Sequence, residues 1–259
     1  MKKTFTILTL LFTGFQVLAQ EETPEMITDR PDATESPTPV PKGFLQLETG
    51  AYYNSFEENT IKTETVGYNT SLFRYGLLDN FELRLGVNFE ETRFSINDVE
   101  SDDVASGFSP LLFGFKIAVL EEKGWVPEIG ILGHLYLPFT AGEDYKPETT
   151  GADFRFSFAH ILSEKSSIGY NLGAQWGNDS RELAYVYTLS YGYSVSKKIG
   201  VYAEVYGDLP ENSQANHFWD AGLTYSIKPN IQLDATIGKS ITEGQDLLLS
   251  TGVSVRLPN

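Results

Sequence analysis

The stretch LAYVYTLSYGYSVSKKIGVYAEVYG, residues 183–207, alternates large apolar or aromatic side chains with small or polar ones. The large side chains of its first half are Tyr185, Tyr187, Leu189, Tyr191, Tyr193 and Val195. A two-residue repeat is the side-chain period of a β-strand. After Lys197 and Lys198 the alternation resumes, which indicates a tight turn between two strands. Long amphipathic strands rimmed by tyrosines are what a bilayer-spanning β-barrel requires.

The same pattern recurs along the chain and predicts twelve strands. They cover residues 43–53, 65–77, 81–90, 108–119, 125–138, 151–161, 166–176, 183–196, 199–207, 217–228, 230–239 and 246–257. The second, fourth and fifth of these strands alternate less regularly than the others. Irregular alternation indicates either β-bulges or a shifted register.

The links between the predicted strands alternate in length. Short links follow the second, fourth, sixth, eighth and tenth strands. The other links are mostly longer and cover residues 54–64, 91–107, 139–150, 177–182, 208–216 and 240–245. Short periplasmic turns opposite longer external loops are typical of outer-membrane barrels. We therefore predict an all-β domain over residues 43–259, a single antiparallel transmembrane β-barrel of about twelve strands.

The composition argues against several other classes of protein. The 259 residues include no cysteine, so a disulfide framework and thiolate chemistry are excluded. Beyond the N-terminus there is no run of 18 or more apolar residues, which argues against a helical membrane protein. The formal net charge of −16 argues against nucleic acid as a partner, because phosphate binding needs clustered Lys and Arg. A soluble β-sandwich or carrier would expose the tyrosine-rich faces to water.

The first 42 residues differ from the rest of the chain. Residues 1–19 combine Lys2 and Lys3 with an apolar core and a small-residue cleavage site, which predicts a secretory signal peptide. Residues 20–42 are rich in acidic side chains and contain Pro24, Pro31, Pro37, Pro39 and Pro41. We expect an extended segment there, because proline disfavours both helix interior and sheet. Two interpretations remain open for it: a periplasmic tether, which we favour, or a plug or lid of the lumen.

Charged side chains fall on the polar faces of the predicted strands. A charge that faces lipid at mid-depth is costly, whereas a charge that faces a water-filled lumen costs little. We therefore place these charges in the lumen and predict that some of them select or gate solutes by size and charge. The candidates are Arg74, Glu82, Arg84, Glu128, Arg155 and Asp220. The alternative is a network of ion pairs that fills and stiffens a nearly closed lumen.

The longer links are mostly acidic. Residues 91–107 contain Glu91, Asp98, Glu100, Asp102 and Asp103 against the single Arg93. One interpretation is that these side chains are solvated loop tips. The other is that they contact anionic surface glycolipid through bridging divalent cations, which carboxylate oxygens bind well.

The sequence shows no catalytic or metal-binding pattern. Its three histidines, His134, His160 and His217, lie far apart, and neither a GxSxG, an HExxH nor a P-loop motif occurs. Nucleophilic catalysis needs a histidine within reach of the nucleophile, and a zinc site needs clustered ligands. We therefore expect no enzyme activity, no cofactor and no metal.

Two stretches resemble a known family. TDRPDATESPTPVPKGFLQLETG, residues 28–50, is similar to the opening of the MetA-pathway of phenol degradation family, which has a TDRPD–TESP element and a GxxQLExG first strand. LFRYGLLDNFELRLG, residues 72–86, resembles the second hairpin of that family, with Arg74, Glu82 and Arg84 matching. The resemblance implies an outer-membrane barrel of Gram-negative bacteria that moves small organic compounds. It assigns no functional residues.

Pattern and resemblance together predict a porin-like barrel, exported to the cell outer membrane, that acts as a passive channel or transporter. Its expected solutes are small, with organic or aromatic compounds among them. The expected partners are outer-membrane lipid, surface glycolipid and a small-molecule solute, with no nucleic acid and no cofactor. The alternative function is a structural or surface-interaction barrel with a closed lumen and acidic external loops.

Overall fold

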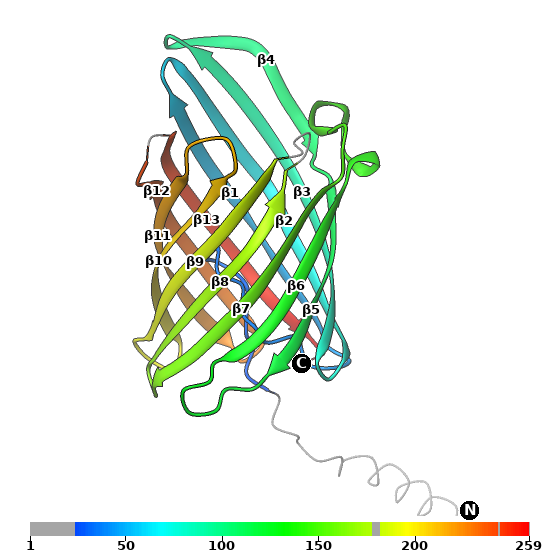
Figure 1. Cartoon of the computed structure of the whole chain (residues 1–259), viewed down its shortest axis with the longest axis vertical. Coiled ribbons are helices and arrows are strands. Elements are labelled where there is room, and N and C mark those ends of the chain that lie inside the picture. Colours follow the sequence, from blue (N-terminus) through cyan, green and yellow to red (C-terminus); the bar gives the residue numbers. More distant parts are fainter. Residues whose placement is uncertain (1–23, 178–181, 243, 259) are drawn as a thin grey trace, which may run out of the picture.

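The alternating segments form antiparallel strands that close into a barrel (Figure 1). The computed structural model describes residues 24–177, 182–242 and 244–258. The predicted signal peptide, residues 1–19, lies outside the described residues. Two short 3-10 helices, Pro138–Thr140 and Glu143–Tyr145, lie in one connection. No helix among the described residues is long and apolar enough to cross a membrane.

The strands follow one another around the barrel. They are β1 Leu45–Glu58, β2 Ile61–Leu78, β3 Phe81–Ile96, β4 Val99–Phe108, β5 Leu111–Leu120, β6 Glu128–Leu137, β7 Gly151–Ser163, β8 Ser166–Trp176, β9 Leu183–Ser194, β10 Ile199–Pro210, β11 Asn216–Lys228, β12 Ile231–Ser240 and β13 Gly244–Leu257. The second half of β3 pairs with β4 and its first half with β5. β4 and β5 therefore occupy together the place of one strand in the barrel wall, which we call a stave. Pro110 separates them because it lacks the N–H that would continue the ladder. The predicted barrel of twelve staves is confirmed.

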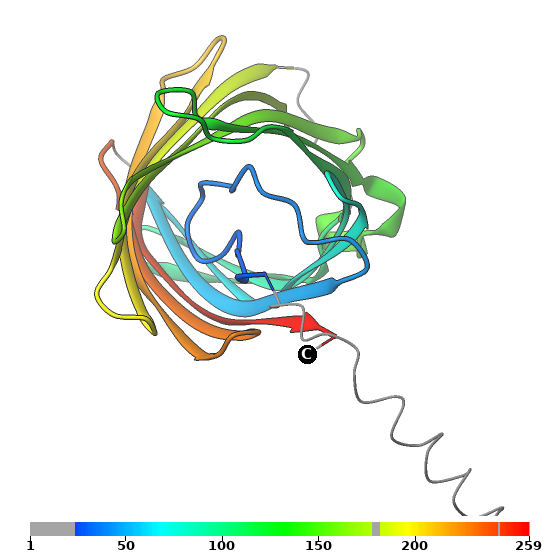
Figure 2. The ribbon, with the colours of Figure 1, turned by 90° about the horizontal axis from the view of Figure 1, so that it is seen from below.

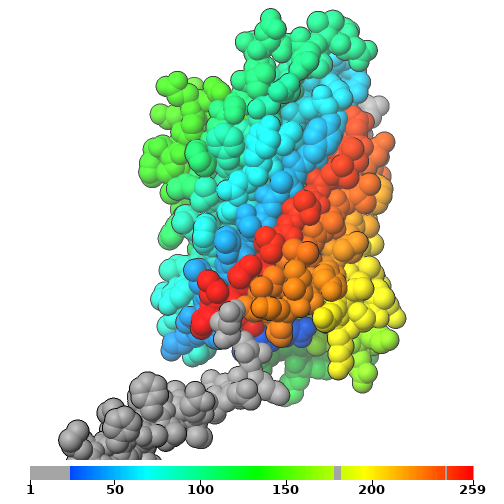
Figure 3. Space-filling view, turned by 180° about the vertical axis from the view of Figure 1, so that it is seen from behind, coloured from blue at the N-terminus to red at the C-terminus, as the bar shows by residue number. Residues whose placement is uncertain are grey.

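The first and last strands close the barrel. β1 pairs with β2 on one side and with β13 on the other, beginning with Leu45 opposite Leu257. Figure 3 shows β13 lying against β1 across the outer surface. Closure leaves no sheet edge with unpaired backbone groups, which a sheet that crosses a bilayer requires.

Two predicted loops are strands instead, so this part of the prediction was wrong. Residues 54–64 and 91–107 continue β1 to β4, interrupted only by tight turns. Asn59, Asn97 and Asp98 in these turns adopt positive φ, which Asn and Asp tolerate better than most residues. The hairpins rise above the rest of the barrel (Figure 1). The strands keep their backbone pairing there without an apolar alternation.

β-Bulges account for the irregular alternation of the second predicted strand and of the end of the fourth. The pairing of β2 shifts by one residue against β1 and again against β3. The pairing of β5 with β6 shifts between Ala118 and Leu120. The extra residue at a bulge shifts the two-residue alternation along its own strand by one position.

The two faces of the wall have opposite chemistry. On β9 and β10, Leu189, Tyr191 and Val201 point outward and are exposed, whereas Ser190 and Glu204 point inward and are buried. Val, Leu and Ile side chains are buried at only three of the described positions, Val40, Leu132 and Val186. A soluble domain buries its aliphatic side chains, so this inverted distribution fits a barrel with hydrocarbon outside and polar groups inside.

Candidate functional site

Residues 24–42, which we name the luminal segment, run through the inside of the barrel (Figure 2). Among the described residues, the backbone of this segment pairs with the sheet only at an isolated bridge between Lys42 and Gly76. Asp29, Thr34 and Val40 of this segment are buried. A buried chain outside the sheet must find other partners for its backbone N–H groups.

Wall side chains supply these partners. Five N–H groups of the luminal segment donate to them over 2.6–3.1 Å: those of Asp29 and Arg30 to Glu48, of Ala33 to Glu204, of Glu35 to Asn171 and of Val40 to Glu82. The acceptors stand on β1, β10, β8 and β3. The segment is therefore held from several sides of the barrel at once.

Asp29 lies at the centre of a buried charge cluster. Its carboxylate is 2.7 Å from Nζ of Lys116 and 3.1 Å from Nη1 of both Arg74 and Arg84. Burial raises the pKa of an isolated carboxyl, but the pKa of Asp29 lies well below its ordinary value because three cations surround it. Glu48 and Glu35 complete the cluster by pairing with Arg74 at 2.7 Å and Arg84 at 2.8 Å.

Three of the predicted lumen residues meet in this cluster. Glu82 lies 3.0 Å from Nε of Arg74 and 3.6 Å from Nη1 of Arg84. All three side chains are nearly inaccessible to water. They bind each other and the luminal segment, and of the three only Arg84 lines the external cavity.

The other three predicted lumen residues lie apart from the cluster and from each other. Glu128 accepts a hydrogen bond from the Thr38 hydroxyl at 2.7 Å. Arg155 donates to the Ala33 carbonyl at 3.4 Å. Asp220 is buried on β11. The six candidates chosen from the sequence did not include Asp29, Arg30 and Glu35 of the luminal segment or their wall partners Glu48 and Lys116. The TDRPD–TESP element contains the first three.

Arg30 reaches the wall at a second place. Its Nη2 lies 3.0 Å from the carboxylate of Asp234 and donates to the Ser250 hydroxyl at 3.0 Å. Gly50 and Gly252 face the guanidinium, and a Cβ at either position would come within 2.6 Å of it. Glycine at these two positions makes the space that Arg30 fills.

Three carboxyl groups gather without a cation on another side of the lumen. They belong to Asp32 and to the register partners Glu204 and Asp220 on β10 and β11. No ion pair between described residues includes any of them. Burial and the neighbouring Glu204 carboxylate raise the pKa of Asp32 well above its ordinary value.

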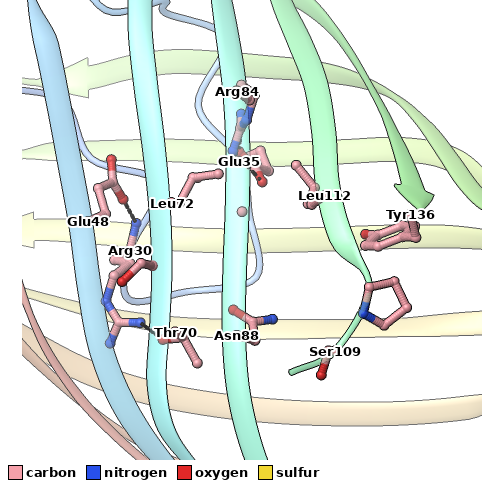
Figure 4. A pocket seen from close by; sticks show the side chains of 13 residues that line it. Arg30, Glu35, Glu48, Thr70, Leu72, Arg84, Asn88, Ser109, Leu112 and Tyr136 are labelled. Carbon is pink, nitrogen blue, oxygen red and sulfur yellow. Dashed lines mark hydrogen bonds and ion pairs between the residues drawn. The ribbon is translucent and has the colours of Figure 1, made fainter. Parts of the chain in front are cut away.

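Open space lies on both sides of the luminal segment. Toward the external end, a cavity of about 320 Å³ opens among Thr70, Leu72, Asn88, Ser109, Pro110, Leu112 and Tyr136 (Figure 4). Toward the short turns, a second cavity of about 580 Å³ is bordered by polar residues such as Ser166, Ser194 and Thr224. Arg30 and Glu35 line both cavities.

The histidines are part of the wall. His134 lies 3.1 Å from the carboxylate of Asp153, and His217 contacts the Tyr187 hydroxyl at 2.8 Å. Within the described parts of the chain, no group of three or more His, Cys, Asp or Glu side chains could hold a metal ion. The site therefore offers charged and hydrogen-bonding groups in a lumen that has space at both ends.

An apolar outer face around a charged lumen defines a β-barrel of the outer-membrane type. The chain belongs to the family of the MetA-pathway of phenol degradation, whose model matches residues 28–257. This match confirms the resemblance seen in the two sequence stretches. No curated protein matches the chain.

Solved structures share the fold at low sequence identity. An outer membrane channel from Pseudomonas putida F1 is 15% identical with a TM-score of 0.64, over 89% of this chain and 100% of that chain. The translocator domain of the autotransporter NalP from Neisseria meningitidis is 11% identical with a TM-score of 0.52, over 83% and 89%. The KdgM porin is 10% identical with a TM-score of 0.51, over 80% and 98%. At these identities the likeness shows a common barrel fold.

Proposed function

We propose that this barrel is a passive channel of the outer membrane that lets small solutes diffuse through its lumen. The observation that carries the proposal is the pair of cavities, about 320 and 580 Å³, on opposite sides of the luminal segment within one closed wall. The concentration gradient drives the flux, so the chain needs no cofactor. The luminal segment acts as a plug that narrows the path.

The outer face supports a position in the lipid bilayer. A strand of 11 residues such as β8, tilted by about 45°, rises by about 25 Å, which is the height of the apolar band of outer-membrane barrels. Leu172, Leu189 and Leu223 are among the exposed apolar side chains on this band. Outer-membrane lipid is therefore the partner of the outer face, and the signal peptide predicted over residues 1–19 provides export.

The external cavity favours small organic solutes. Leu72, Pro110 and Leu112 give it an apolar wall, and Tyr136 adds an aromatic ring. Thr70 and Asn88 provide hydrogen-bonding groups on the same cavity. A volume of about 320 Å³ is at the lower end of the range for small-molecule sites. We infer solutes of the size of a substituted benzene ring with one polar end.

The balance of charge in the lumen favours cations over anions. Glu204 and Asp220 have no cation in the ion pairs of the described residues, and the cluster around Asp29 contains more carboxylates than cations. Unpaired carboxylates attract cations and repel anions in a pore. We therefore expect K⁺ to permeate better than Cl⁻.

Planar-bilayer recordings in a KCl gradient at pH 8 test the channel. The full chain should give small unitary currents. Their reversal potential should be shifted toward the equilibrium potential of K⁺. Deletion of residues 24–41 should raise the unitary conductance severalfold, because it empties the lumen. Absence of current from both proteins, with no solute uptake by proteoliposomes, would contradict the channel.

A second candidate is a structural or surface-interaction barrel, favoured by the sealed ion pairs around Arg74 and Arg84. In that case the acidic hairpin of β3 and β4 would carry the function by binding divalent cations and surface glycolipid. Shortening this hairpin by residues 94–103 separates the two candidates. The channel predicts unchanged Ca²⁺ and lipopolysaccharide binding, and the structural barrel predicts that both are lost while permeability stays the same.

A further inference from the structure

The charged side chains of the luminal segment differ in their access to water. The side chain of Asp29 is 2% exposed, and those of its partners Arg74 and Lys116 are fully buried. Arg30 and Glu35 each keep 18% of their side chain exposed. The buried charges can only hold the segment, whereas the partly exposed side chains of Arg30 and Glu35 can also contact a solute.

Arg30 and Glu35 stand where the two cavities meet. Of all the residues that line the external cavity, only these two also line the second cavity, the one toward the short turns. In Figure 4, Arg30 reaches toward Thr70 and Glu35 lies beside Arg84, both at the margin of the external cavity. A solute that moves from one cavity to the other must therefore pass their side chains.

The wall is shaped to keep the luminal segment in place. A Cβ at Gly76 would lie 2.1 Å from the carbonyl oxygen of Pro41, and a Cβ at Gly130 would lie 2.7 Å from that of Pro37. These glycines let the segment backbone approach the wall more closely than any other residue allows. This close packing holds the segment in place together with the ion pairs of Asp29 and the backbone hydrogen bonds described above.

We propose that the luminal segment stays seated during transport and that Arg30 and Glu35 form the selectivity filter. The inference rests on the proposed channel function. Rotation of these two partly exposed side chains opens a path. It releases Glu35 from Arg84 but leaves the ion pairs of Asp29 with Arg74, Arg84 and Lys116 in place. A guanidinium and a carboxylate offer both donors and acceptors to the polar end of a solute, so neutral or dipolar organic molecules are the class that this filter favours.

A reversible disulfide tests whether the segment moves. The chain has no cysteine, and the Thr34 and Thr188 hydroxyl oxygens are 2.7 Å apart. Sulfur atoms at these positions are within reach of an S–S bond of about 2.05 Å. The double variant Thr34→Cys/Thr188→Cys should conduct alike when oxidised and when reduced. The single variant Thr34→Cys, treated with the same oxidant, controls for side reactions.

Selectivity measurements test the filter itself. Arg30→Gln should raise the K⁺ to Cl⁻ permeability ratio severalfold, and Glu35→Gln should lower it severalfold. Arg30→Lys keeps the charge and should keep the ratio, which separates a filter role from misfolding. Lys123→Gln and Glu121→Gln change charge at exposed positions that line neither cavity, so both should behave as the parent protein.

The possible results test the further inference and the proposed channel function separately. If oxidation closes the double variant and a reductant reopens it, the segment moves during transport and the inference is wrong. If Arg30→Gln and Glu35→Gln match the controls, the filter lies elsewhere. If even the protein without residues 24–41 carries no current, the channel function fails, and the filter fails with it.

Discussion

The Asp29 carboxylate meets three wall cations at a place closed to water. Buried ion pairs of this kind gain little over apolar packing while they are complete. Removal of one member, however, leaves its partners charged and unpaired in a medium of low polarity. The position of the luminal segment therefore depends on Asp29 more than on any exposed charge of the segment.

We predict that Asp29→Asn lowers the free energy that holds the luminal segment against the wall by about 3 kcal/mol. Its N–H groups would then exchange with solvent about a hundredfold faster, since each 1.36 kcal/mol corresponds to a factor of ten. Hydrogen exchange followed by mass spectrometry of peptides from residues 24–42 measures this change. Asp79→Asn, in an exposed turn, is the matched control. Equal protection in both variants would contradict the central role of Asp29.

Asp32 is in the opposite situation, among carboxyl groups. Its raised pKa means that the folded protein holds this proton more tightly than the unfolded chain. The stabilising contribution is therefore complete below the unfolded pKa of about 3.9 and is lost as the pH rises through the folded pKa. The contribution of Asp32 to stability is therefore smaller at neutral pH than at low pH.

We predict that Asp32→Asn is more heat-stable than the parent protein, by a margin that is small at pH 4 and grows toward pH 8. Asparagine cannot ionise, so the variant avoids the loss that the parent suffers. Circular-dichroism melting curves in detergent over this pH range measure the margin. A margin that does not change with pH would show that the charge of Asp32 has no part in it.

At the scale of a single element, β9 shows why the alternation of apolar and polar residues predicts the direction of side chains within the bilayer. Its outward residues Leu189 and Tyr191 meet lipid, while Thr188 and Ser190 are buried in the lumen. Reversal of this order would place hydroxyl groups in hydrocarbon. The apolar pattern is thus imposed by the two solvents on the two sides of the strand.

We predict that Leu189→Lys, at the middle of β9, destabilises the barrel by about 2–4 kcal/mol, because it places a charge at mid-depth in the lipid. Val195→Lys, outside β9 at its end, should cost about 0–1 kcal/mol near the interface. Urea titration of both variants folded into vesicles compares the two costs. Similar costs at the two positions would argue against a membrane around β9.

At the scale of the whole molecule, the wall and the luminal segment are separable. The ladder from β1 through β13 closes without any strand from residues 24–42. The segment joins distant parts of this wall, since Arg30 pairs with Asp234 and Thr34 contacts Thr188. The wall gives the barrel its shape, and the segment fills it.

We predict that the protein without residues 24–41 still assembles as a barrel but unfolds at a lower temperature. The strand pairings remain, whereas Arg74, Arg84 and Lys116 lose the Asp29 carboxylate. Strand content from circular dichroism and heat-modifiable migration on gels measure assembly and stability separately. Aggregation in place of assembly would show that the wall needs the segment in order to fold.

The strand number, the antiparallel order and the lipid-facing residues could be predicted from the sequence. The protruding hairpins at residues 54–64 and 91–107 could not, because water on both faces removes the apolar pattern while the backbone pairing stays. The inward direction of Arg74 and Asp220 followed from their place in the alternation. That Arg74 binds Asp29 while Asp220 meets Glu204 did not follow, because strand parity gives a direction and no partner.

The sequence by itself determined which side of each stave faces lipid, because side-chain direction alternates along any extended chain. It also indicated an extended start to the mature chain, from prolines that neither helix nor sheet accepts. Only the tertiary structure decided that residues 24–42 lie within the lumen and that Asp29 is sealed while Arg30 and Glu35 are not. Such contacts join residues as far apart as Arg30 and Asp234, 204 positions along the chain, and depend on how the closed wall brings them together.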